Sequence, residues 1–144
     1  MECQEKRKIW YKIAHAFTHP LHSLSSCTGG TINEIKNVVN TFAHKQGTST
    51  GALLAHNTAI SIGNYKPICS IWYCSGASID HGMNIIGYKY DTINNNYFKY
   101  VLHDSDIPET SNPRIIASTY NATSVSFNYG GNTYTWSNSI YDWS

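Results

Sequence analysis

One histidine and one downstream aspartate have the types and the spacing that proton-transfer chemistry requires. His81 precedes an apolar segment over residues 83–90, and Asp104 directly follows a second apolar segment over residues 97–103. Two adjacent antiparallel strands would place such a histidine beside such a carboxylate, which is how an acid orients an imidazole. The sequence therefore predicts a His81–Asp104 contact of about 2.6–3.2 Å between heavy atoms.

Neighbouring polar residues leave other assignments open. Asp106 is a rival acid, but it lies two residues further along in a loop that contains proline, so we favour it as a turn residue. The nitrogen and oxygen ligands of His81, His103, Asp104 and Asp106 would also suit zinc. Because His103 and Asp104 are adjacent on a strand and point apart, at most three of these ligands can converge.

Aromatic residues near the C-terminus offer a third interpretation, a module that binds peptide or sugar. Aromatic rings stack on such ligands. We prefer a simpler explanation, in which one face of a hairpin packs in the core and the other is a tyrosine-rich surface. The residues concerned are Phe127, Tyr129, Tyr134, Trp136, Tyr141 and Trp143.

The first half of the chain favours helices. Residues 5–17 have apolar side chains at helical spacing, and Thr31 with Glu34 forms a capping box for a second helix. Gly47 supplies a stop signal for that helix. Residues 52–62 fit a strand and a short helical turn.

Beyond Pro67 the pattern changes to that of strands. Helices precede antiparallel strands, so we predict an α+β fold, with N-terminal helices packed on a C-terminal antiparallel sheet, in one domain over residues 1–144. The expected strands cover residues 68–74, 83–90 and 97–103, with a loop over 105–114 and a hairpin over 124–136.

The composition excludes several classes of protein. A net charge of +1 and scattered basic residues argue against a nucleic-acid partner. No apolar run approaches the roughly 18 residues of a membrane span, and residues 1–8 lack the core of a signal peptide. We therefore expect a cytoplasmic protein or part of a longer chain. No nucleotide-binding glycine loop is present, so no cofactor is expected. Cys69 and Cys74 are predicted to be free core thiols.

The chain resembles the papain-like cysteine peptidases, most closely their C39-like branch, over roughly residues 28–106. The resemblance implies a partial papain-like fold and hydrolysis of peptide bonds in a peptide or protein substrate. His81 would be the general base and acid, and Asp104 its orienting group. It also favours a secreted or cell-surface location. The matching segments are Lys66-Pro67-Ile68, Asp80-His81-Gly82-Met83-Asn84-Ile85-Ile86-Gly87-Tyr88 and His103-Asp104.

The resemblance further implies a cysteine nucleophile at the start of an N-terminal helix, usually as Cys-Gly or Cys-Trp after a glutamine. This chain has no such motif. Cys3 lies at the start of the first predicted helix, where the helix dipole would lower the pKa of a thiol. Cys27 lies just before the second helix. Three cases stay open: a nucleophile upstream of this chain, Cys3 itself, or an inactive or unrelated protein.

Overall fold

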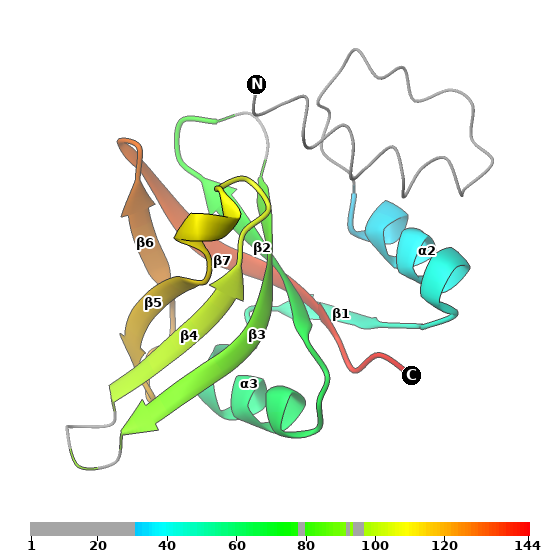
Figure 1. The fold of residues 1–144 in the computed structure, drawn as a ribbon, viewed down its shortest axis with the longest axis horizontal. Helices are drawn as coiled ribbons and strands as arrows, with labels where there is room; N and C mark the ends of the chain where they lie inside the picture. The colour runs from blue at the N-terminus through cyan, green and yellow to red at the C-terminus, as the bar shows by residue number, and fades with distance from the viewer. Residues whose placement is uncertain (1–30, 78–79, 92, 94–96) are drawn as a thin grey trace. The chain divides into compact units, whose positions relative to one another are not determined.

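The computed structural model describes residues 31–77, 80–91, 93 and 97–144 (Figure 1). The chain divides into two compact units, one formed by residues 1–47 with 143–144 and the other by residues 48–142. The helix expected over residues 5–17 lies outside the described residues, as do Cys3 and Cys27. Among the described helices, none is long and apolar enough to cross a membrane.

The first unit contains helix α2 (Ile32–Ala43), which begins at the predicted capping box. The Thr31 hydroxyl accepts the Glu34 backbone N–H at 3.2 Å, and the Glu34 carboxylate accepts the Thr31 N–H at 2.6 Å. These two bonds satisfy N–H groups that a helix start leaves without partners. The helix ends at Ala43 because His44 adopts a left-handed φ of 52°, so the stop predicted at Gly47 is wrong.

The second unit is built around one antiparallel sheet of seven strands. Their order is β1-β7-β2-β3-β4-β5, and β6 pairs with β7 along the edge that β1 also uses. Helix α3 (Leu54–Gly63) packs against β2 and β3 (Figure 1). The strands are β1 (Thr48–Gly51), β2 (Ile68–Cys74), β3 (His81–Asp91), β4 (Tyr97–His103), β5 (Arg114–Thr119), β6 (Ser126–Tyr129) and β7 (Asn132–Tyr141).

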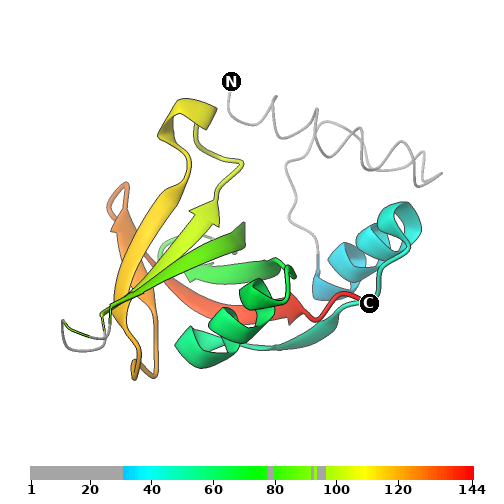
Figure 2. The same cartoon turned by 60° about the horizontal axis from the view of Figure 1, so that its bottom comes forward.

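The sheet curls strongly, as the two views of the ribbon show (Figure 1, Figure 2). The rings of Tyr100 on β4 and Trp136 on β7 have centroids 5.6 Å apart, although β3 and β2 lie between their strands. In a flat sheet, three strand spacings of about 4.8 Å would separate β4 from β7 by roughly 14 Å. The curl therefore brings the two ends of the sheet toward each other around an aromatic core.

The predicted α+β arrangement, with a papain-like packing of N-terminal helices on the sheet, is wrong. The described chain is mostly antiparallel sheet with two short α-helices. Residues 114–119 form β5, which was not expected, and β7 continues to Tyr141. Because the sheet curls on itself, much of its core is buried between its own strands. The largest buried side chains include Trp72, Met83, Ile85, Phe98, Tyr100 and Trp136.

Candidate functional site

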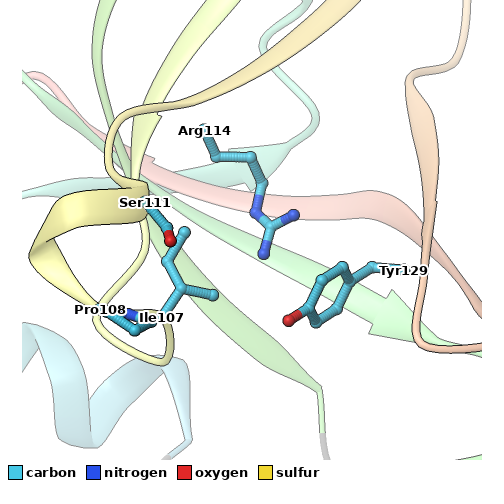
Figure 3. Close-up of a pocket in the computed structure, with 5 residues that line it drawn as sticks. All are labelled: Ile107, Pro108, Ser111, Arg114 and Tyr129. Carbon is cyan, nitrogen blue, oxygen red and sulfur yellow. The ribbon is translucent and has the colours of Figure 1, made fainter.

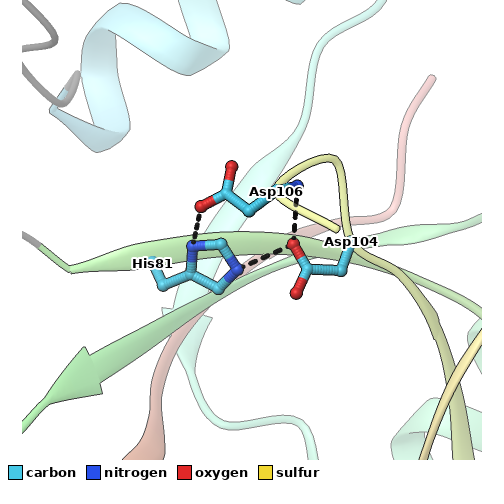
Figure 4. A group of neighbouring side chains, drawn as sticks. All are labelled: His81, Asp104 and Asp106. Atoms are coloured by element: carbon cyan, nitrogen blue, oxygen red, sulfur yellow. Dashed lines mark hydrogen bonds and ion pairs between the residues drawn. The ribbon is translucent and has the colours of Figure 1, made fainter. Parts of the chain in front are cut away.

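The structure brings His81 and Asp104 together at one end of the sheet (Figure 4). His81 is the first residue of β3, and Asp104 directly follows β4. The Nε2 atom of His81 lies 2.9 Å from Oδ1 of Asp104, within the predicted range. The Asp104 side chain is only 1% exposed and that of His81 is 17% exposed, so water screens this pair weakly.

Asp106 contacts the second ring nitrogen. Its Oδ2 lies 3.0 Å from Nδ1 of His81, and its backbone N–H donates to Oδ1 of Asp104 at 2.9 Å (Figure 4). An aspartate that accepts the N–H two residues on forms an Asx turn, and this turn directs Asp106 back toward the ring. Asp106 is therefore the turn residue that the sequence predicted, and it is also a direct partner of His81, the role of rival acid that was not favoured.

Two residues from the segment after β4 fix Asp104. Arg114 donates to Oδ2 of Asp104 through Nε at 3.2 Å and Nη2 at 2.9 Å. Asn112 holds the Asp104 backbone, since its Oδ1 accepts the N–H at 2.9 Å and its Nδ2 donates to the carbonyl at 3.0 Å. Sequence reasoning missed both residues. Asn112 lies in the loop expected over residues 105–114, and Arg114 opens the strand β5, which was not expected.

These contacts decide the charges of the site. Burial alone would lower the pKa of His81, but its hydrogen bonds and charge interactions with Asp104 and Asp106 prevail and raise that pKa from 6.5 to about 9. Burial alone would raise the pKa of Asp104, but His81, the Asp106 amide and Arg114 lower it from 3.8 to about 2. At neutral pH the imidazole is therefore an imidazolium, whose two N–H groups each face a carboxylate.

The two described cysteines lie in β2, and both are free. Burial raises the pKa of the Cys69 thiol to about 11, which suppresses the reactive thiolate. The buried Cys74 thiol faces the Ser75 carbonyl at 3.8 Å. Within the described residues, both nitrogens of His81 are occupied by carboxylates, and neither cysteine is hydrogen-bonded to the ring.

The same three side chains fit a metal ion poorly. Ligand atoms of His81, Asp104 and Asp106 lie within 4.8 Å of one another. His103 turns away and contacts Glu109 at 3.0 Å, in agreement with the expected limit of three converging ligands. The second oxygen of Asp104 binds the Arg114 guanidinium, whose positive charge would repel a cation. The Asp104 carboxylate therefore suits hydrogen bonds to the His81 imidazolium and the Arg114 guanidinium better than it suits zinc.

Aromatic rings from the hairpin contact this cluster. The Arg114 guanidinium carbon lies 4.9 Å from the ring centroid of Phe127 and 4.6 Å from that of Tyr129. The ring of Tyr134 lies 5.8 Å from that of His81 and stacks on Phe127 at 5.0 Å. The hairpin thus packs aromatic rings against two members of the cluster, Arg114 and His81.

No family model matches this chain, and no curated protein matches it. The resemblance to C39-like peptidases rests on the motif residues alone and stays a prediction.

Proposed function

We propose that this chain supplies the acid–base half of a thiol-dependent hydrolase of peptide bonds. The supporting observation is the His81–Asp104 contact of 2.9 Å, with a carboxylate only 1% exposed. Arg114 binds the second oxygen of that carboxylate, and Asn112 holds the Asp104 backbone. A catalytic imidazole needs such a fixed partner to keep one orientation through proton transfer.

The proposed chemistry begins with an ion pair between a cysteine thiolate and the His81 imidazolium. A pKa of about 9 for His81 keeps the ring protonated at neutral pH, which would stabilise a neighbouring thiolate. After attack on the peptide carbonyl, the imidazolium would donate its proton to the leaving amine. Cys3 is the candidate nucleophile in this chain, and it lies outside the described residues.

In this proposal the thiol competes with Asp106. Nε2 of His81 faces Asp104, so the thiol would pair with Nδ1, which now lies 3.0 Å from the Asp106 carboxylate. The side chain of Asp106 is 21% exposed and lies on a loop. Its displacement would therefore disturb less buried structure than that of Asp104.

A second candidate function, a non-catalytic domain that binds peptide or sugar, is favoured by the same Asp106 contact. If Asp106 stays in place, His81 has no nitrogen left for a nucleophile. The four charged groups His81, Asp104, Asp106 and Arg114 would then form a structural cluster that joins β3, β4 and β5.

The two candidates are separated by the rate at which each cysteine of the full chain reacts with iodoacetamide at pH 7, followed by mass spectrometry. The hydrolase proposal expects Cys3 to react at least about 10-fold faster in the native chain than in His81→Gln, since a thiolate is the reactive form. Cys69 is a slow internal reference, because burial raises the pKa of its thiol. His103→Gln is the matched control, because His103 also contacts a carboxylate but lies outside the cluster.

Two results would overturn the hydrolase with Cys3 as its nucleophile. One is slow labelling of every cysteine, and the other is fast labelling of Cys3 that His81→Gln leaves unchanged. Circular dichroism of each variant establishes whether the sheet is retained, so that loss of folding is not mistaken for loss of activation. If mass spectrometry shows that a Cys3→Ala variant still gains the fast label, the reactive thiol belongs to another cysteine.

A further inference from the structure

A small pocket of about 210 Å³ adjoins the charged cluster (Figure 3). Its lining residues are contiguous with the cluster, since Ile107 follows Asp106 in the chain and Arg114 binds Asp104. Pockets for drug-sized ligands usually exceed about 300 Å³, so this one suits a single side chain or chain end. The lining residues are Ile107, Pro108, Ser111, Arg114 and Tyr129.

Arg114 links the pocket to His81. Its Nε and Nη2 donate to one oxygen of Asp104, while the other oxygen of that carboxylate contacts His81. The guanidinium and the imidazolium are thus held on the two oxygens of one side chain. A guanidinium carries five N–H donors, and the hydrogen bonds within the described residues engage only its Nε and Nη2 atoms.

The geometry leaves the pocket side of the guanidinium for a ligand. Its carbon lies 4.6 Å from the Tyr129 ring and 4.9 Å from the Phe127 ring, so aromatic contacts hold the group in a fixed plane. Figure 3 shows the guanidinium extending between Tyr129 on one side and Ile107 with Ser111 on the other. Planar, fixed N–H donors match the two oxygens of a carboxylate, and the side chain of Ile107 offers an apolar wall for its alkyl stem.

We infer that this pocket binds the carboxylate of a peptide ligand. The inference rests on the proposed function where it concerns the choice of substrate. A peptide whose carboxylate binds Arg114 would present a neighbouring peptide bond to His81. Two cations and two carboxylates balance the charge of the cluster at neutral pH, so no net negative charge opposes an incoming anion. Recognition would then depend on geometry more than on long-range attraction.

The test is a titration of the ¹⁵N-labelled full chain with three short peptides, followed by backbone NMR shifts. The peptides are acetyl-Ala-Glu-Ala-amide, its Gln counterpart, and acetyl-Ala-Ala-Ala with a free C-terminal carboxylate. A charge-assisted pair should make the Glu peptide bind about 10-fold more tightly than the Gln peptide, with shifts at residues 107–111. If the C-terminal carboxylate is the preferred source, the third peptide binds best instead.

Two variants check that the pocket is responsible. Arg114→Lys replaces a planar donor by a point charge, and it should reduce the Glu-to-Gln ratio to near one. Because this change also touches Asp104, Ile107→Trp provides a second variant that fills the pocket without removing a partner of the cluster. It should abolish binding of all three peptides, whereas His103→Gln should leave every affinity unchanged.

Equal binding of all three peptides, or a preference that survives Ile107→Trp, would overturn the inference. Its failure is distinguishable from that of the hydrolase. If the chain prefers the carboxylate peptides but no cysteine is activated, the pocket assignment stands and the hydrolase with Cys3 does not. If a cysteine is activated but no peptide is preferred, the hydrolase stands and the pocket assignment does not.

Discussion

Two histidine–carboxylate pairs of almost equal length lie close together in this protein, and their surroundings differ sharply. The His81–Asp104 pair measures 2.9 Å and its side chains are 17% and 1% exposed. The His103–Glu109 pair measures 3.0 Å, but its side chains are 38% and 81% exposed. The buried pair has Arg114 and Asp106 as further partners. Distance alone therefore does not distinguish a candidate site from a surface contact.

The difference has an energetic meaning. An exposed ion pair contributes about 0–1 kcal/mol, since water and salt screen it. Removing one member of a buried pair costs about 3–5 kcal/mol, because a charge is left without a partner away from water. Asp104 serves two cations at once, so the buried pair should be the more sensitive of the two to substitution.

The largest effect is expected for Asp104→Asn, which keeps the shape of the side chain and removes its charge. His81 and Arg114 would then lose the carboxylate they share, and the free energy of unfolding should fall by about 3–5 kcal/mol. Urea denaturation followed by tryptophan fluorescence measures the change. The matched variant Glu109→Gln should shift it by less than about 0.5 kcal/mol. Equal losses in both variants would show that burial does not separate the pairs.

The second-largest effect is expected in the pH dependence of stability, through the titration of His81. The pKa of His81 is about 9 in the folded state, against an ordinary value of 6.5, so the folded state binds the proton more tightly than the unfolded state does. This contribution is complete below pH 6.5 and is lost as the pH rises through 9, at a cost on the order of 3 kcal/mol. Asp104 acts in the opposite range, since its lowered pKa gives stability that is lost as the pH falls from about 4 toward 2.

Unfolding free energies measured between pH 6 and 10 test this expectation. His81→Gln should remove most of the decline that the native chain shows across pH 6.5–9, and His103→Gln should keep it. A decline of the same size in His81→Gln would assign the titration to other groups and would remove the electrostatic distinction between the two pairs.

The sequence predicted the strands of this site well because their signals are local. The bounds of β2 and β4 agree with those expected, and the His81–Asp104 contact follows from two adjacent antiparallel strands. Strand β3 begins two residues earlier than expected, at His81 itself. Alternating apolar residues encode strands of this kind without help from the rest of the fold.

The remaining features depend on tertiary contacts that one sequence does not encode locally. Strand β5 begins with Arg114, whose guanidinium is held by Asp104 and by rings of β6, so its place becomes clear only once the sheet has curled. The role of Asp106 depends on an Asx turn. The α+β expectation failed for the same reason, because it assigned to helices the burial that the curled sheet provides.

The smallest effect on stability, and the most direct test of function, is expected for Asp106→Asn. This side chain is 21% exposed, so its replacement should cost about 1 kcal/mol or less. The pKa of His81 should fall, since one of two neighbouring carboxylates is lost while Asp104 remains. An NMR titration of the His81 ring protons in both chains measures that change, and an unaltered pKa would mean that Asp106 does not contact the ring in solution.

The labelling rate of Cys3 in the same variant separates the two proposed functions. If a thiol and Asp106 compete for Nδ1 of His81, removing the carboxylate favours the thiol, and labelling should accelerate even though the imidazole has become less basic. If His81 is structural, the rate stays as it was, because no thiol approaches the ring. If the labelling rate of Cys3 instead falls together with the pKa of His81, Asp106 assists the thiol. That result would contradict the competition between Asp106 and the thiol, but it would agree with the hydrolase.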